Sequence, residues 1–438
     1  MRAVRTRSCR TAGKVRKKFN FEPGSNSMAT IQPRQRLYDI NNSGFLRAVV
    51  TNTLNDADDG HFKEVFCSFA GVDDVIPLPR GRLAVYFAVK HAVAQSGRRK
   101  VLLSAFTIFD LINMVYLAGG SPLFVDIEPR SPHLAPGTLE AAIDETTAAV
   151  IVTHYHTANH RIQEIAGLCA RKGVMLIEDC AIALGARIKD QHVGAFGDVG
   201  MYSFGLFKPV CTYFGGAMVA KSRALRDSVR EQLAGWPVMR AKEMWPNFIK
   251  GLKMNALTQP TVFNYFTFPV FRLGVRHDIA LITNQSKNDP DPVLRSTLPL
   301  EYERRPSSFQ LREWARQLAH AERHREIRLR NARAYHSVLR GVNWLTVPSW
   351  PDDNADSFLN FPILVEEDRD TVVRAVMEAG FDCTKYYYRN CAMIDQFAAF
   401  ARSLPNLQHY VDHVVVFPTH PSVPLDYVER LSRVLVQL

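Results

Sequence analysis

The sequence predicts an α/β protein, with a mostly parallel sheet covered by helices in a large domain and a smaller C-terminal α/β domain. Between residues 99 and 220, apolar runs without polar alternation are separated by amphipathic stretches at helical spacing. This pattern is typical of parallel strands that are buried on both faces. The length of 438 residues also exceeds a single typical core, which favours at least two domains.

The elements of the large domain are expected in a regular order. A helix should begin at Gly81, because apolar residues recur at helical spacing from Ala84 to Val93. The predicted strands follow at 99–106, 121–129, 148–156, 174–181 and 201–204, with helices at 110–120, 138–147 and 160–174 between them. A further apolar run follows the turn signal at Gly215 and Gly216.

The remaining parts of the chain differ in composition. From Ser307 a long amphipathic helix is expected to lead into a smaller domain of alternating strands and helices. We therefore expect four parts, which are a basic disordered extension at 1–35, a large domain at 36–230, an aromatic and basic insertion at 231–300, and a small domain at 301–438.

The ends of the predicted strands point to a site. Ligands of parallel sheets bind at the carboxyl ends of the strands, which here selects 106–109, 154–157 and Asp179. A carboxylate that follows the apolar run 174–177 is costly to bury without a cationic partner. The alternatives for Asp179 are an N-cap or a surface ion pair.

Lys208 is the main candidate for chemistry. It lies between Phe207 and Pro209, and the proline should hold it in an extended or turn conformation. Desolvation by the neighbouring aromatic and aliphatic side chains would favour the neutral amine, which forms Schiff bases. The alternative is an ordinary loop lysine whose stem packs on the surface.

The start of the helix at Gly81 is a candidate anion site. Backbone amides at a helix N-terminus face outward, and the helix dipole favours an anion such as phosphate there. The alternative is an ordinary glycine at a helix cap.

The charge and cysteine patterns exclude several classes of protein. The net charge is +11, but residues 1–27 hold eight Lys or Arg and one Glu, so the rest of the chain is only mildly basic and no nucleic-acid partner is expected. Met28 is an alternative start. The seven cysteines show no metal-ligand spacing, so we expect no metal and a cytoplasmic protein with reduced thiols. No apolar run is long enough for a transmembrane helix.

The insertion carries an aromatic segment with basic borders. Residues 244–276 are flanked or interrupted by lysines and arginines, which suggests peripheral contact with a membrane. Packing on a second subunit, or a roof over the active site, is the alternative. Pro260 and Pro269 are expected to break the segment into separate helices.

Several motifs in a fixed order resemble a known family. They are GRLA (81–84), SAFTIFDLINMVYLAGGSPLFVDIEP (104–129), AVIVTHYH (149–156), VMLIEDCA (174–181), VGAFGDVGMYSFGLFKPV (193–210) and FGGAMV (214–219). This succession resembles the DegT/DnrJ/EryC1/StrS family of pyridoxal-phosphate sugar aminotransferases. The resemblance implies the PLP-dependent transferase fold of type I, and a homodimer with shared active sites.

The resemblance also implies roles for single residues. Lys208 falls on the lysine that holds pyridoxal 5'-phosphate as a Schiff base and then moves a proton. Asp179 falls on the acid that pairs with the pyridine nitrogen, and Ser203 on a phosphate ligand. The phosphate-binding helix start falls on Gly81, Arg82 and Leu83. By their place at strand ends and in loops, and not from the resemblance, His154, His156, Tyr387 and His420 could face substrate, and core packing is the alternative for Tyr387 and His420.

Four positions depart from the pattern of the family. Ile182 stands where a Gln or His is common, and Ile108 where an aromatic side chain commonly stacks on the cofactor, a role that Phe106 or Phe109 could take over. Thr157 replaces a glycine. Glu303 replaces an asparagine that reaches the phosphate of the neighbouring subunit, although Arg305 is close in sequence.

The resulting functional hypothesis is an aminotransferase that converts a nucleotide-linked keto sugar to an amino sugar, with glutamate as donor. Two alternatives keep the fold. A dehydratase of the same family would replace the lysine with histidine, so Lys208 speaks against it. A non-catalytic regulatory or membrane-associated relative would draw its support from Ile182, Ile108 and Glu303.

Overall fold

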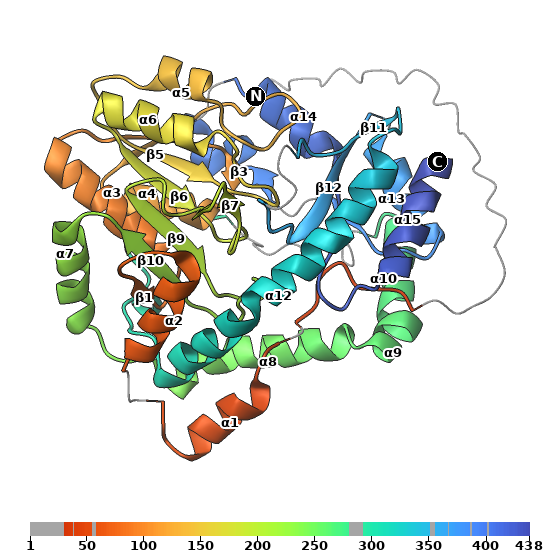
Figure 1. Ribbon diagram of the computed structural model, residues 1–438, viewed down its shortest axis with the longest axis horizontal. Helices are drawn as coiled ribbons and strands as arrows, with labels where there is room; N and C mark the ends of the chain where they lie inside the picture. The colour runs from red at the N-terminus through yellow and green to blue at the C-terminus, as the bar shows by residue number, and fades with distance from the viewer. Residues whose placement is uncertain are drawn as a thin grey trace, which may run out of the picture.

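The computed structural model describes residues 30–37, 39–54, 58–279, 292–350, 355–366, 368–385, 388–400 and 403–438. A large helix-covered sheet and a smaller sheet lie at opposite ends of the molecule, and the helix α12 runs obliquely from one to the other (Figure 1). This arrangement confirms the predicted α/β fold class.

The large sheet has seven strands in the order β1-β10-β9-β6-β5-β2-β4. Neighbours from β4 to β9 are parallel, and β10 is antiparallel to both β9 and β1. The sheet is therefore mostly parallel, as predicted. The strands are β1 (Ile76–Leu78), β2 (Lys100–Leu103), β4 (Ser121–Phe124), β5 (Thr147–Thr153), β6 (Met175–Asp179), β9 (Val199–Ser203) and β10 (Gly216–Ala220).

Helices cover this sheet and leave its strands almost wholly buried. In helix α3, half of the residues are buried. Its apolar residues therefore extend around more than one face of the helix. The helices of this part are α2 (Gly60–Ala70), α3 (Leu83–Ser96), α4 (Phe109–Leu117), α5 (Pro136–Ala142), α6 (Ile162–Lys172) and α7 (Arg223–Ala234). Two short ribbons add β3 (Phe106–Thr107) with β14 (Arg389–Asn390), and β7 (Arg187–Ile188) with β8 (Gln191–His192).

The small sheet has four antiparallel strands in the order β11-β12-β15-β13. A second hydrophobic core lies between this sheet and its helices. The elements are β11 (Leu345–Thr346), β12 (Asn360–Val365), α13 (Arg369–Glu378), β13 (Thr384–Lys385), η4 (Cys391–Met393), η5 (Asp395–Phe400), α14 (Pro405–His413), β15 (Val414–Pro418) and α15 (Leu425–Gln437).

Helix α12 (Ser308–Leu339) connects the two cores. It begins with the predicted serine, because Ser307 accepts a hydrogen bond from the Gln310 main chain while the Gln310 side chain accepts one from Ser307. Trp314 packs in the core of the large sheet, and Tyr335 packs in the core of the small sheet.

The insertion forms a helical layer that lies below α12 in Figure 1. It contains α8 (Ala241–Leu257), α9 (Pro260–Val262), η1 (Phe263–Thr267) and α10 (Phe268–Arg276). Pro260 begins a new helical segment, as predicted. The predicted break at Pro269 is wrong. The wider π-helical turn of η1 precedes this proline, and helical geometry continues through it into α10.

The N-terminal segment packs against the small sheet. Arg34 binds the buried carboxylate of Asp382 through its main chain and its guanidinium, with an Nη2–Oδ1 distance of 2.6 Å. Residues 30–35 therefore belong to the folded body and not to a disordered extension, and residues 1–29 lie outside the described residues. Helix α1 (Asn42–Val50) follows, capped by Asn41, and 3₁₀-helix η3 (Leu300–Tyr302) precedes α12. Among the described helices, none is long and apolar enough to cross a membrane.

Candidate active site

Lys208 lies on a sharp turn between β9 and β10. Its main-chain N–H donates to the carbonyl of Gly205 over 3.2 Å, and Phe207 before it has a φ of 64°, in the left-handed region. The structure thus has the turn conformation that Pro209 predicts. A side chain other than glycine is strained at such a φ, which is a feature that functional loops often retain.

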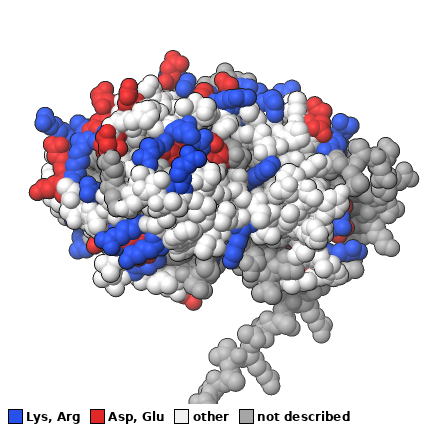
Figure 2. Space-filling model, turned by 90° about the horizontal axis from the view of Figure 1, so that it is seen from below, with Lys and Arg blue, Asp and Glu red and all other residues white. Residues whose placement is uncertain are grey.

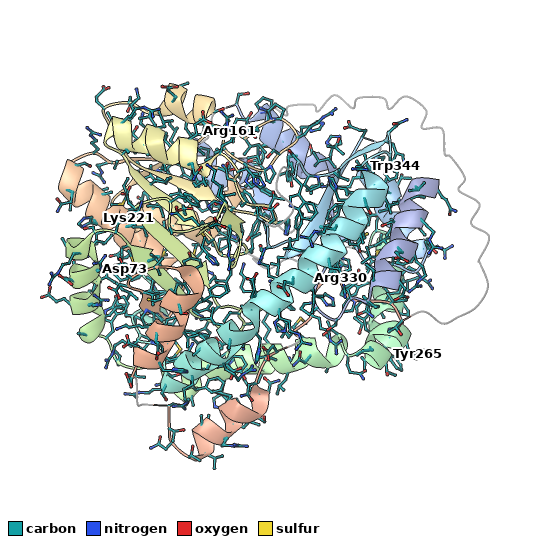
Figure 3. All side chains as sticks on the ribbon, viewed as in Figure 1. Asp73, Arg161, Lys221, Tyr265, Arg330 and Trp344 are labelled. Atoms are coloured by element: carbon teal, nitrogen blue, oxygen red, sulfur yellow. The ribbon has the colours of Figure 1, made fainter. Side chains whose placement is uncertain are left out.

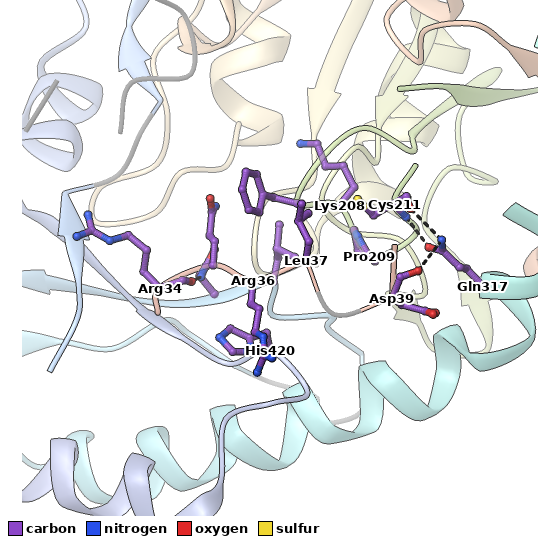
Figure 4. A pocket seen from close by; sticks show the side chains of 13 residues that line it. Arg34, Arg36, Leu37, Asp39, Lys208, Pro209, Cys211, Gln317 and His420 are labelled. Carbon is purple, nitrogen blue, oxygen red and sulfur yellow. Dashed lines mark hydrogen bonds between the residues drawn. The ribbon is translucent and has the colours of Figure 1, made fainter. Parts of the chain in front are cut away.

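A small, partly open pocket borders Lys208 (Figure 4). Its wall combines the lysine loop with α12, the small domain and the N-terminal segment 34–39. In Figure 4 the Lys208 side chain points away from His420 and Arg36, toward the strands of the large sheet. Gln317 ties the loop to the N-terminal segment, since it hydrogen-bonds Cys211 and the carbonyl of Asp39.

Asp179 is the last residue of β6 and is buried, with 5% of its surface exposed. One carboxylate oxygen accepts a hydrogen bond of 3.0 Å from the Ala181 main chain, and the other accepts a long one of 3.4 Å from Thr153. Burial raises the pKa of Asp179, while Lys208 acts in the opposite direction. The loop therefore places the lysine within electrostatic reach of the carboxylate that ends β6.

Gly81 lies against the end of β9. A Cβ atom on Gly81 would lie 2.5 Å from the carbonyl oxygen of Tyr202 and 3.1 Å from Cα of Ser203. Only glycine therefore permits the start of α3 to approach the strand that carries Ser203. Gly216 is required for the same reason, because its Cβ would lie 2.3 Å from Cα of Gly81.

Two hydrogen-bond donors meet at this close approach. In the part of the chain that the structure describes, neither the main-chain N–H of buried Gly81 nor the hydroxyl of Ser203 has a protein acceptor. Buried N–H groups in proteins are almost always hydrogen-bonded, so an unpaired one suggests a missing partner. Donors at the N-terminus of a helix commonly bind an anion. The pair fits a phosphate group.

The guanidinium of Arg82 is not placed as expected of a phosphate ligand, and the main-chain N–H of Leu83 donates to the carbonyl of Arg80 over 3.2 Å. The guanidinium of Arg82 forms a close ion pair with Asp110 and also contacts the Tyr302 hydroxyl at 3.3 Å. The Leu83 side chain is fully buried in the core. The charge of Arg82 is thus neutralised by its ion pair with Asp110.

His156 lies next to the lysine. Its Nδ1 accepts a hydrogen bond of 3.2 Å from the Asn360 main chain, which connects the end of β5 to the small sheet. Burial, with a further contribution from the Lys208 charge, lowers the pKa of His156 to about 3. The imidazole is therefore neutral at physiological pH.

His154 does not face the cavity. It is fully buried, and its Nε2 lies 2.9 Å from Oε2 of Glu178, which also accepts hydrogen bonds from the main chains of Gly194 and Gly197. Cys180 lies close enough for these three side chains to form a metal-like cluster. Since the hydrogen bonds already use the carboxylate and imidazole, the cluster is structural.

The apolar residues that were predicted to contact the cofactor pack mainly in the hydrophobic core. Phe106 is fully buried and packs edge-on against Tyr388 and Tyr410. Phe109 stacks on Phe397, and Ile182 is buried. Only Ile108, at the N-cap of α4, is partly exposed.

The last two candidates come from the small domain. His420 lines the cavity, but it is buried and its Nε2 lies 2.8 Å from the carbonyl of Pro33, with its pKa lowered to about 4 mainly by burial. Tyr387 lies outside the described residues. The segment 34–39 was missed by sequence reasoning, because nothing in its composition signals that it folds back over Lys208.

The DegT/DnrJ/EryC1/StrS aminotransferase family model matches residues 48–255 and 313–436. The chain belongs to this family. The match includes most of α8. The unmatched residues 256–312 include α9, η1 and α10, so these three elements of the helical layer lie outside the family model.

Two curated relatives illustrate the similarity of this family member to sugar-modifying enzymes. It is 25% identical over 373 residues to dTDP-4-dehydro-2,3,6-trideoxy-D-glucose 4-aminotransferase of Saccharopolyspora spinosa, covering 83% of this chain and 84% of that enzyme. It is 29% identical over 188 residues to GDP-perosamine synthase of Vibrio cholerae, covering 43% of this chain and only 51% of that enzyme.

Solved structures agree in fold. PseC of Helicobacter pylori superposes with a TM-score of 0.70 at 17% identity, over 93% of this chain and 98% of that one. The GDP-4-keto-6-deoxy-D-mannose-3-dehydratase of E. coli gives 0.70 at 16% identity, over 93% and 100%. The shared fold therefore extends across members with different reactions.

Proposed function

We propose that this protein is a pyridoxal-phosphate-dependent aminotransferase that converts a nucleotide-linked keto sugar to an amino sugar, with glutamate as amino donor. The observation that carries the proposal is the convergence of Lys208, buried Asp179 and the donors of Gly81 and Ser203 at one end of the large sheet. The substrate class draws on the sugar-modifying relatives and on no residue of the cavity.

The residues fit the cofactor. The steric cradle at Gly81, with the Ser203 hydroxyl beside it, would hold the phosphate. Asp179 would accept a hydrogen bond from the protonated pyridine nitrogen, and that positive charge would keep the buried carboxylate ionised. When bound, pyridoxal phosphate supplies an electron sink for cleavage of a bond to the substrate carbon.

Lys208 has two tasks in this scheme. Its Nζ would hold the cofactor, and its free amine would move a proton to or from the substrate carbon. The turn at Phe207 holds the lysine over the end of the sheet. His156 remains uncharged beside it and so does not repel the protonated amine.

The cavity wall would exclude water around these groups. The N-terminal segment 34–39, fixed by Arg34 on Asp382 and by Gln317 on Asp39, closes one side. A closed site strengthens the interaction between Lys208 and Asp179, because the local dielectric is lower than that of water.

Activity on sugars tests this proposal. The full-length protein, incubated with pyridoxal phosphate, glutamate and a panel of nucleotide-linked keto sugars, is expected to yield 2-oxoglutarate and an amino sugar in equal amounts. A protein that releases no 2-oxoglutarate from glutamate, or from other common amino donors, would contradict transamination.

We also propose that the enzyme is a homodimer with shared active sites. The support is the family. Light scattering on the purified protein would show twice the chain mass of 49.5 kDa.

Peripheral contact with an anionic membrane is a second proposed interaction. Several large apolar side chains of α8, η1 and α10 are exposed, and Figure 2 shows a broad uncharged area with scattered Lys and Arg on the face seen from below. Between residues 244 and 277 there are four Lys or Arg and no acidic residue. Tyr265, which projects at the lower edge in Figure 3, and Phe266 are 60% and 68% exposed.

A further inference from the structure

Arg80 is held between aromatic rings directly before Gly81. Its Cζ lies 3.8 Å from the centre of the Phe214 ring and 5.5 Å from the centre of the Tyr302 ring. Stacking on Phe214 fixes the plane of the guanidinium and leaves its N–H groups at the edges of that plane available as donors.

The charge of Arg80 is not neutralised by a direct partner. Within the described residues, its guanidinium has no hydrogen-bond acceptor and no carboxylate within ion-pair distance. Burial, together with repulsion from Arg82, lowers the pKa of Arg80 to about 10, so it still carries its charge at physiological pH.

Asp110, the buried acid near Arg80, already has hydrogen-bond donors on both of its carboxylate oxygens. Asp110 binds Arg82, Arg295 at 3.1 Å and the Tyr302 hydroxyl, and the amide of Asn113 lies 3.4 Å away. Burial opposes its ionisation, but Arg82 and these hydrogen bonds outweigh burial and lower the pKa of Asp110 to about 2. No acceptor capacity remains for Arg80.

The local charges therefore do not balance. Among the residues that the structure describes, Arg82 and Arg295 share the one buried carboxylate, Asp110, and the positive charge of Arg80 is in excess. The side chain of Glu301 is the other acid that acts on Arg80, but its residue is exposed to solvent and its effect is screened. A phosphate ester is negatively charged and would compensate the excess.

We propose that Arg80 binds a phosphate ester at the start of α3, beside the N–H of Gly81. The inference rests on the proposed function and deepens it, because it assigns anion binding to Arg80 and leaves Arg82 to hold Asp110. The ester is the phosphate of pyridoxal phosphate or the diphosphate of the nucleotide-linked sugar. Both present the oxygen atoms that a guanidinium fork recognises.

The test compares Arg80→Gln with wild type in the full chain after bound cofactor has been released with hydroxylamine and removed by dialysis. Binding of pyridoxal phosphate, of pyridoxal without phosphate, and of dTDP, UDP and GDP is measured by fluorescence titration. Arg430→Gln is the matched control, because Arg430 also lies over aromatic rings, at 5.7 Å from Phe381, but in the small domain. Circular dichroism and thermal melting check the fold.

A phosphate-selective loss supports the inference. Arg80→Gln is expected to weaken pyridoxal phosphate about 10-fold to 100-fold and to leave pyridoxal unchanged, since charge-assisted hydrogen bonds contribute on that scale. If the nucleoside diphosphates weaken instead, the sugar carrier is the ligand. Arg80→Lys, which keeps the charge, should lose less in either case.

Two results would overturn the inference. One is equal weakening of pyridoxal and pyridoxal phosphate, which would mean a structural role. The other is unchanged binding of every phosphate compound. If wild type binds no pyridoxal phosphate at all, the proposed function fails. The anion site is then tested separately, by comparing how much inorganic pyrophosphate raises the melting temperature of wild type and of Arg80→Gln.

Discussion

His154 and Glu178 form a fully buried pair beneath the candidate active site, with 2.9 Å between Nε2 and Oε2. The same carboxylate accepts the main-chain N–H groups of Gly194 at 2.8 Å and Gly197 at 2.6 Å. Glu178 thus fixes the loop between β8 and β9 to the end of β5. It precedes Asp179 in β6, so it also fixes the strand that positions this acid.

Removal of this carboxylate should destabilise the protein strongly. We expect Glu178→Ala to lower the free energy of unfolding by about 3–5 kcal/mol, because it leaves a buried imidazole and two buried N–H groups without their acceptor. Glu164→Ala, at an exposed ion pair with Arg161, should change it by less than about 0.5 kcal/mol. Urea denaturation measures both, and equal effects would refute the structural role of Glu178.

A methyl group on Gly81 should disturb both the fold and the phosphate site. Its Cβ would meet the Tyr202 carbonyl at 2.5 Å, so Gly81→Ala is expected to cost about 1–3 kcal/mol and to weaken pyridoxal phosphate. Gly137→Ala is the control, since no atom lies within 4 Å of its Cβ and helix propensity should rise. Thermal melting and fluorescence titration measure the two effects. A Gly81→Ala protein that matches wild type in both would contradict the proposed close approach.

Asp179→Asn should have opposite effects on stability and on cofactor binding. The folded-state pKa of Asp179 is raised, so its ionisation costs stability once the pH exceeds its unfolded value of about 4. The cofactor-free variant is therefore expected to melt higher than wild type at pH 7–8, with a difference that shrinks on acidification toward pH 4. Pyridoxal phosphate should bind the variant more weakly, because the ring nitrogen loses its anionic partner.

Melting curves of cofactor-free protein at several pH values decide this point. A variant less stable than wild type at pH 8 would show that a cation of the protein already compensates Asp179. Unchanged binding of pyridoxal phosphate would remove Asp179 from the cofactor site.

Membrane contact is tested by the exposed aromatic residues of η1. The double variant Tyr265→Ser and Phe266→Ser should co-sediment less with vesicles that contain anionic phosphatidylserine, at low salt, than wild type does. Exposed Tyr116→Ser on α4 is the control. Failure of wild type to co-sediment, or equal binding to neutral vesicles, would contradict contact with an anionic surface.

The sequence predicted the large domain well because its signals are local. Uninterrupted apolar strands and the amphipathic helices between them are signals that act over a few residues, and these elements occur in their expected order in the structure. The turn at Lys208 was also predictable, since the following proline restricts it directly.

Other features depend on contacts between distant residues. The sequence could not show that His154 is hydrogen-bonded to Glu178 or that Arg82 forms an ion pair with Asp110. It also could not show that Arg34 binds Asp382, which is 348 positions away. Pro269 was expected to end a helix, but the π-turn before it depends on packing in three dimensions. Local pattern therefore located Lys208 and Asp179 as candidates, while the ion pairs of the charged residues around them could be seen only in the structure.

Chemical trapping of the cofactor tests the central claim most directly. The full-length protein is mixed with pyridoxal phosphate, treated with borohydride to reduce any carbon–nitrogen double bond, and digested for mass spectrometry. We predict a phosphopyridoxyl group on Lys208, no such group at this position in Lys208→Ala, and unchanged labelling in the exposed control Lys172→Ala. Labelling spread over surface lysines, with Lys208 unmodified, would contradict the account.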